Sequence, residues 1–119
     1  MAYVDGFVLA VPKNNLQVYR RIATQAGKIW RKHGALHYVE AVGDDLEVKF
    51  GVPFTKMMKI KRGETVIFSW IVFKSRAHRD RVNAKVMKDP KLNEMMQNAP
   101  MPFDVKRMVY GGFKFLVEA

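Results

Sequence analysis

The sequence of 119 residues contains no cysteine. This absence excludes disulfides, thiolate metal sites and cysteine nucleophiles, and it fits a reducing compartment. The sequence also lacks a run of about 18 consecutive apolar residues, the minimum for a helix that spans a membrane. The first residues, Met1–Gly6, have neither the basic head nor the apolar centre of a signal peptide. We therefore expect a cytoplasmic protein with no membrane partner.

Acidic residues are scarce, and none occurs between Gly6 and Val39. The formal net charge is +10, from 21 Lys and Arg against 11 Asp and Glu, and a second basic stretch runs from Lys74 to Lys91. Such a surface attracts anions, including nucleic acid. A solvated surface without a partner explains the same charge, so nonspecific nucleic-acid binding by a basic dimer is kept as the alternative function.

The hydrophobic pattern predicts the order strand, helix, strand, strand, helix, strand. The strands are expected over residues 3–11, 35–42, 64–73 and 107–117, and the helices over 16–33, 76–88 and 91–97. Within 46–62, the alternation of Leu46, Val48 and Phe50 suggests a short extra strand before Pro53. The order predicts one α+β domain over 1–119, a ferredoxin-like βαββαβ fold with an antiparallel sheet.

The strand over 64–73 has apolar residues on both faces, with Phe68 and Trp70 on one side and Ile67 and Ile71 on the other. Right-handed crossovers place both helices on one face of such a sheet, which leaves the other face bare. Soluble monomers rarely keep an apolar patch of that size. We expect a homodimer that joins two sheets in a dimeric α/β barrel. The alternative is that residues 46–62 cover the bare face of their own chain.

Six stretches carry a family resemblance: Tyr3–Val8, Gly34–Leu36, Glu64–Ile71, Arg79–Asp80, Asn83–Pro90 and Met101–Phe113. With these motifs the chain resembles the YbaA-like family of small uncharacterised bacterial proteins over nearly its whole length. The resemblance implies a dimeric α/β barrel related to small monooxygenases of the antibiotic-biosynthesis type. It implies no established activity.

Two carboxylates, Asp5 and Glu40, fall inside predicted strands among apolar neighbours. A carboxylate in such surroundings either pairs with a cation or has its pKa raised, and a raised pKa suits a general acid or base. Lys106 and Arg107 are available as cationic partners for these carboxylates. The alternative to a general acid or base is therefore a structural ion pair at the edge of the sheet. Arg107 is also expected to form a clasp with Asp104, three residues earlier.

We predict either a small-molecule binder or a cofactor-independent oxygenase-like enzyme, and the sequence leaves open whether it is an enzyme. The site would lie between sheet and helices, with Trp70 and Tyr110 as walls and Glu40 and Arg107 orienting a small apolar or aromatic ligand. No cofactor is expected. No metal is expected either, because Gly34 ends the helix between the two histidines spaced four apart, His33 and His37.

Overall fold

The computed structural model describes residues 2–98 and 100–119 and has one four-stranded antiparallel sheet. The strands β1 (Tyr3–Pro12), β2 (His37–Val42), β3 (Glu64–Phe73) and β4 (Val109–Lys114) lie in the order β2-β3-β1-β4. The helices are α1 (Leu16–Lys32), α2 (Phe54–Met57), α3 (Arg76–Met87) and α4 (Pro90–Asn98), with 3-10 turns η1 (Lys13–Asn15) and η2 (Val105–Arg107). The strand order is that of a ferredoxin-like fold, as predicted.

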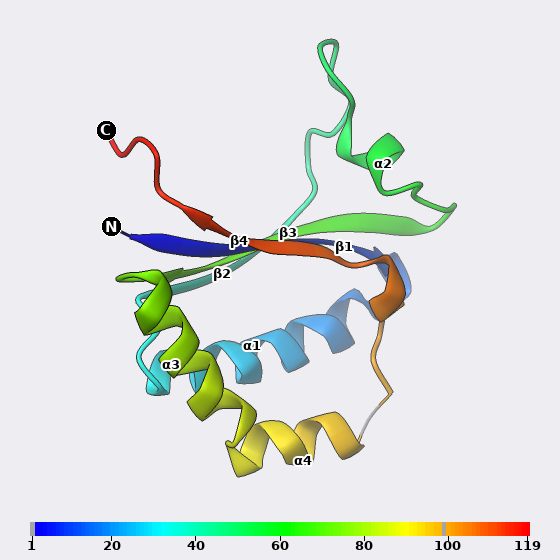
Figure 1. Ribbon diagram of the computed structural model, residues 1–119. Coiled ribbons are helices and arrows are strands. Elements are labelled where there is room, and N and C mark those ends of the chain that lie inside the picture. Colours follow the sequence, from blue (N-terminus) through cyan, green and yellow to red (C-terminus); the bar gives the residue numbers. More distant parts are fainter. Residues whose placement is uncertain (1, 99) are drawn as a thin grey trace.

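Helices α1, α3 and α4 all lie on one side of the sheet, and α2 lies on the other (Figure 1). We call the two sides the helix face and the open face. Because side chains alternate along a strand, Ser69 and Ile71 of β3 point to the helix face, whereas Phe68 and Trp70 point to the open face. Of the described helices, none is both long and apolar enough to cross a bilayer.

Helix α1 is amphipathic, and its apolar side rests on the helix face. Tyr19, Ala23, Ala26 and Ile29 recur every three or four residues and are buried. The helix ends at Lys32, and two residues later Gly34 has a φ of +117°, which lies in a region that a residue with a side chain rarely adopts. That turn directs the chain into β2.

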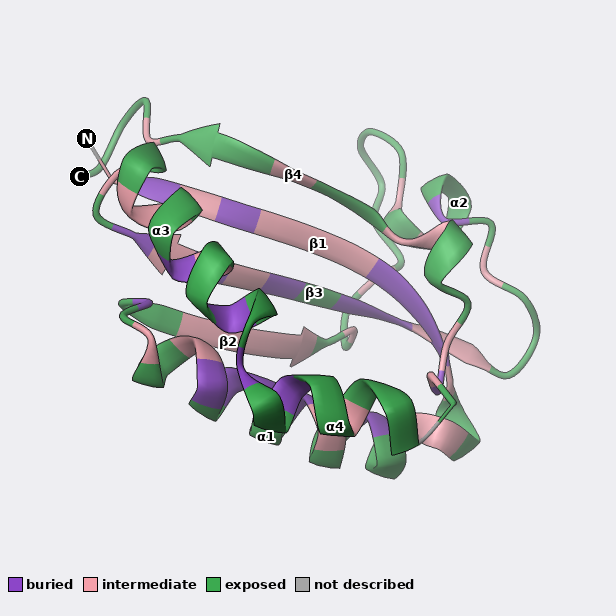
Figure 2. Cartoon of the chain, turned by 60° about the horizontal axis from the view of Figure 1, so that its bottom comes forward, coloured by how far each residue is buried: buried purple, intermediate pink, exposed green. Residues whose placement is uncertain are grey.

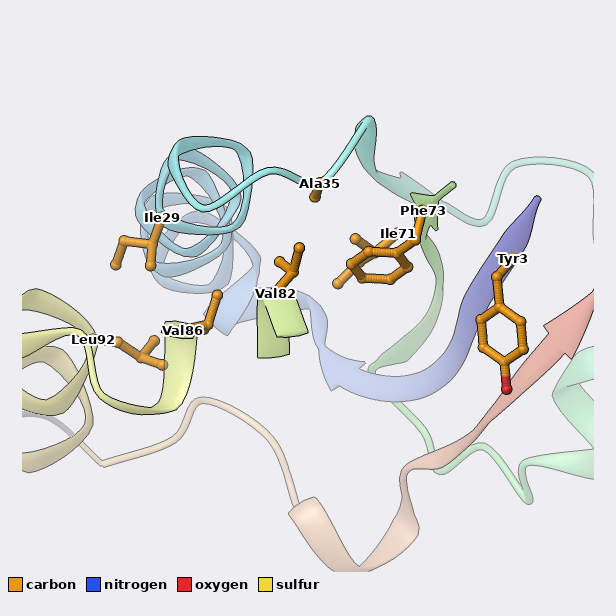
Figure 3. Packing of buried hydrophobic residues seen from close by; sticks show 8 residues of the cluster. All are labelled: Tyr3, Ile29, Ala35, Ile71, Phe73, Val82, Val86 and Leu92. Carbon is orange, nitrogen blue, oxygen red and sulfur yellow. The ribbon is translucent and has the colours of Figure 1, made fainter. Parts of the chain in front are cut away.

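The main core joins the sheet to the three helices of the helix face. It contains Phe73 and Ile71 of β3 together with Val82 and Val86 of α3, and Figure 3 shows how these side chains meet. Phe73, Val82 and Val86 are almost completely buried. Burial is concentrated in the central strands β1 and β3, whereas the edge strand β4 is largely exposed (Figure 2).

The segment between β2 and β3 contains no strand, so the extra strand that we predicted around Leu46–Phe50 is wrong. A strand needs a neighbour for its backbone groups, and Gly51, with φ of +73°, and Pro53 turn the chain away before one is reached. Instead, Phe54 of α2 packs edge-on against Phe68, with ring centroids 5.9 Å apart. The segment therefore covers one part of the open face.

Two predicted strands are shorter than expected. Strand β2 starts at His37, because the preceding Ala35 and Leu36 carbonyls accept hydrogen bonds from Arg31 Nη1. Strand β4 starts at Val109 and not at residue 107, since Asp104 caps the 3-10 turn η2 by accepting from the Lys106 amide at 3.0 Å.

The junction of α1, α3 and α4 is held by Asp89, whose side chain is only 2% exposed. Its Oδ1 accepts from the Lys91 amide at 2.8 Å and so caps α4, and its Oδ2 lies 2.6 Å from His33 Nε2 at the end of α1. The His33 bond lowers the pKa of Asp89 to about 2. One carboxylate thus links three helices.

We expect Asp89→Asn to lower the thermal midpoint at pH 7, because asparagine keeps the helix cap and loses the charge that pairs with His33. A lowered pKa in the folded state stabilises the protein above the unfolded value of 3.8, and this contribution is lost as the pH falls towards 2. Thermal unfolding of both proteins at pH 7, 4 and 2.5 checks this. A difference between them that does not shrink below pH 4 would contradict the assignment.

Candidate functional site

A cavity of about 630 Å³ lies between the helix face and helices α1, α3 and α4. We call it the interior cavity. Its lining is mostly aromatic and aliphatic, with the following residues among its walls: Phe7, Leu9, Ile22, Ala26, Trp30, Ile71, Leu92, Phe103 and Tyr110. The exposed lining residues include Tyr110 at 68%, Met87 at 57% and Met96 at 55%, so the cavity opens between β4 and the helices α3 and α4.

Methionine is concentrated in this lining. Of the eight methionines in the chain, five line the interior cavity: Met87, Met95, Met96, Met101 and Met108. The thioether side chain is flexible and polarisable, and it makes favourable contacts with aromatic rings. Such a wall can adjust to apolar or aromatic guests of different shape.

The polar centre of the cavity is Glu40 on β2, which accepts hydrogen bonds from two tyrosines. The Tyr19 hydroxyl donates to Oε1 at 2.5 Å, and the Tyr38 hydroxyl donates to Oε2 at 2.7 Å. Gly27 of α1 leaves room for the Tyr38 ring, because a Cβ at residue 27 would lie only 2.8 Å from that ring. We call Tyr19, Tyr38 and Glu40 the tyrosine–carboxylate triad.

Burial, reinforced by the Glu40 charge, raises the pKa of both tyrosines in the triad. They therefore stay protonated and act as hydrogen-bond donors throughout the physiological pH range. Each carboxylate oxygen has room for more than one hydrogen bond. Glu40 can consequently accept a further bond from a guest that carries a hydroxyl or an N–H group.

A second polar group, the pair of Asp5 and Arg79, lies elsewhere on the cavity wall. Arg79 Nη1 donates to Asp5 Oδ1 at 2.8 Å, and its guanidinium lies 4.9 Å from the ring centre of Tyr3. Burial raises the pKa of Asp5, against the opposing effect of the Arg79 charge. The nearby Asn83 accepts from the Trp30 indole at 3.0 Å. The Arg79 contacts fasten α3 to β1, and the Asn83–Trp30 bond joins α3 to α1.

The four predicted site residues are not brought together. Glu40 and Tyr110 both line the interior cavity, where the Tyr110 ring stacks on Phe7 with centroids 5.8 Å apart. Trp70 lies on the open face instead, because its neighbours Ser69 and Ile71 take the positions that face the helices. The ligand-binding role of Glu40 and Tyr110 stays a prediction.

Arg107 does not line the cavity and instead holds the segment before β3. Its guanidinium donates to both oxygens of Glu64, at 2.6 and 2.9 Å, and to the Lys59 carbonyl at 3.1 Å. The predicted clasp with Asp104 is therefore replaced by a pair with Glu64. Arg107 is also not the partner of Asp5 or Glu40, since those carboxylates sit further along the sheet, over the helices.

Sequence reasoning missed three residues that shape the site: Tyr19, Tyr38 and Arg79. A signal existed for Tyr38, because residues two apart on one strand share a face, which puts it beside Glu40. Tyr19 looked like any other member of the apolar side of α1. In residues 2–98 and 100–119, no cluster of three or more His, Asp or Glu side chains is placed to hold a metal ion.

Solved structures of low sequence identity share this fold. A dimeric ferredoxin-like protein from an uncultured marine organism superposes with a TM-score of 0.58 at 11% identity, covering all of both chains. A NIPSNAP-like domain protein from Burkholderia xenovorans gives 0.60 at 12% identity over 99% of this chain and 88% of the other. A nipsnap family protein of unknown function from Agrobacterium tumefaciens gives 0.59 at 14% identity, over 94% and 86%. The class is thus an α+β, ferredoxin-like protein.

Residues 2–105 match the family described as protein of unknown function DUF1428, and the chain belongs to that family. It is 41% identical over 118 residues to the uncharacterized protein YbaA of Escherichia coli K12, covering 99% of each chain. YbaA of Shigella flexneri matches to the same extent. The resemblance seen in the sequence motifs is confirmed.

We expect Tyr38→Phe to destabilise the protein by about 2 kcal/mol, because it removes a donor from a charged, partly buried acceptor. Urea unfolding of the variant and the parent protein measures the change. Tyr110→Phe is the matched control, since the Tyr110 side chain is largely exposed and should change the stability by only a few tenths of a kcal/mol. Equal effects of the two substitutions would argue against a structural triad.

Proposed function

We propose that the protein binds a small apolar or aromatic molecule in the interior cavity. The observation that carries this proposal is a cavity of about 630 Å³ with mostly apolar walls and a carboxylate, Glu40, whose hydrogen-bond donors are neutral tyrosines, whereas the other carboxylate of the lining, Asp5, is paired with Arg79. Ligand sites commonly combine such walls with a few placed polar groups. The guest would enter beside Tyr110, pack against the methionines and donate a hydrogen bond to Glu40.

A more specific version of this proposal is that the protein is a cofactor-independent, oxygenase-like enzyme. Glu40, which unlike the other lining carboxylate Asp5 has no cationic partner, would take a proton from an aromatic guest, and the resulting anion would supply the electrons for a bond to molecular oxygen, giving a peroxide. The two tyrosine donors would keep the carboxylate fixed during that transfer. Binding is the primary proposal, and it stands whether or not a reaction follows.

The partner that we propose for the open face is a second copy of this chain. The strand positions on this face are mostly valine and aromatic residues, and they include Phe113, Val109 and Phe68, which are 60%, 52% and 43% exposed. Packing two such faces together would remove this apolar surface from water. The result would be the dimeric α/β barrel expected from the sequence.

Nucleic-acid binding through the open face has less support than self-association. Stacking platforms for bases combine aromatic side chains with cations that contact phosphates. On the strands of the open face the charged side chain is Glu64, an acid already paired with Arg107, and His37 is the remaining ionisable group. The aromatics of this face therefore fit an apolar partner.

We expect indole, an aromatic molecule with one N–H donor, to raise the thermal midpoint by about 5 °C at ten times its dissociation constant. Ala26→Met should abolish most of this shift, because Ala26 lines the interior cavity and the longer side chain fills it. Differential scanning fluorimetry and native mass spectrometry measure binding.

Ala84→Met is the matched control for this experiment, since Ala84 is exposed on α3 and does not line the cavity. The same titration with 1-methylindole, which lacks the N–H group, should give a smaller shift because it cannot donate to Glu40. An indole shift that survives Ala26→Met would remove the interior cavity as the site.

We expect Phe113→Glu to convert a dimer into a monomer in solution, because it places a charge in the apolar contact between two open faces. Light scattering coupled to size exclusion gives the mass. Val18→Glu is the matched control, since Val18 is an exposed apolar residue of α1, remote from the open face. A parent protein that is monomeric at micromolar concentration would contradict the proposed partner.

A further inference from the structure

A second cavity lies outside the interior cavity, between helix α1 and strand β2. We call it the α1–β2 groove. Its volume is about 770 Å³, and its apolar lining comes from Leu16, Ala23, Val42 and Ile67. Tyr19, Ala23, Tyr38 and Glu40 line both spaces, so the tyrosine–carboxylate triad separates the groove from the interior cavity. The groove is large enough for a bicyclic aromatic ring.

The rim of the groove is basic. Arg20, Lys28 and Arg31 of α1 line it, and Arg20 and Lys28 lie two helical turns apart, about 12 Å along the axis. Arg31 is occupied by the Ala35 and Leu36 carbonyls. Across the described part of the chain, neither Arg20 nor Lys28 forms a salt bridge with a carboxylate. Their charges are thus open to an anionic ligand.

The floor of the groove is acidic, in contrast to its basic rim, because Glu40 lies there. Both Glu40 oxygens already accept from tyrosine hydroxyls, and each retains capacity for another donor. An anionic group at the floor would be repelled, whereas a hydroxyl would find an acceptor. The groove therefore selects a ligand with different groups at its two ends.

We propose that the α1–β2 groove binds a hydroxyaryl carboxylate. The aromatic ring lies on the apolar lining, the carboxylate lies at the rim between Arg20 and Lys28, and the hydroxyl donates to Glu40. Each of the three parts of this ligand corresponds to one feature of the groove: apolar area, free positive charge and a partly buried acceptor. The site is separate from the interior cavity and does not require that cavity to be occupied.

Three fluorescent probes test the proposal: 6-hydroxy-2-naphthoate, which carries both groups, 2-naphthoate, which lacks the hydroxyl, and 2-naphthol, which lacks the carboxylate. Titration of the parent protein should show 6-hydroxy-2-naphthoate binding about tenfold more tightly than 2-naphthoate, through the hydrogen bond to a charged acceptor. Its affinity should fall with added salt, whereas that of 2-naphthol should not.

Two variants identify where 6-hydroxy-2-naphthoate binds. The double variant Arg20→Ala with Lys28→Ala should weaken 6-hydroxy-2-naphthoate about tenfold and leave 2-naphthol unchanged, because only the carboxylate contacts the rim. Thr24→Trp should block the groove for both probes, since Thr24 lines the groove and not the interior cavity. Both changes lie on the exposed side of α1, so the fold is retained.

Ala26→Met separates this proposal from the one for the interior cavity, because Ala26 lines the interior cavity alone. Affinity for 6-hydroxy-2-naphthoate that survives Ala26→Met and is lost in Thr24→Trp supports the groove. Affinity that is lost in Ala26→Met and survives Thr24→Trp overturns it. Absence of binding by 6-hydroxy-2-naphthoate to the parent protein, or no preference over 2-naphthoate, overturns it as well.

Discussion

The arrangement of this molecule depends on the one-sided covering of a sheet whose two faces are both apolar. Helices α1, α3 and α4 all lie on one side, and α2 with its flanking segment reaches a limited area around Phe68 on the other. The covered side encloses a cavity, because the side chains of the helices and of the sheet do not fill all the space between these two layers. The uncovered side has no such layer, so its apolar surface is available to a second copy of the chain.

Within the covered side, Glu40 places a carboxylate among mostly apolar groups. Glu40 is kept in place by Tyr19 from α1 and Tyr38 from its own strand, and Tyr38 fits only because residue 27 is glycine. The same three side chains form the partition between the interior cavity and the α1–β2 groove. A ligand in either space would meet the same carboxylate from a different side.

The strand order and the two faces of β3 could be predicted from the sequence, because periodicity and right-handed crossovers leave few alternatives. The candidate site could be predicted only in part. Glu40 and Tyr110 were found as a carboxylate and an aromatic on strands, whereas Trp70 was assigned to the wrong layer and Arg107 to the wrong partner. Those errors concern contacts between distant segments, such as Arg107 with Glu64 and Asp5 with Arg79, for which local pattern carries no information.

The tyrosine–carboxylate triad is also the part of the structure that stability explains least well. Removing a carboxylate from water is costly, and replacing a buried charged group by well-packed apolar side chains is often neutral or stabilising. The surrounding walls, rich in methionine and aromatic residues, could accommodate such a replacement. Glu40 thus lies between two cavities with neutral tyrosines as its donors and no cation in its hydrogen-bonding set, an arrangement that supports the proposed contact with a ligand.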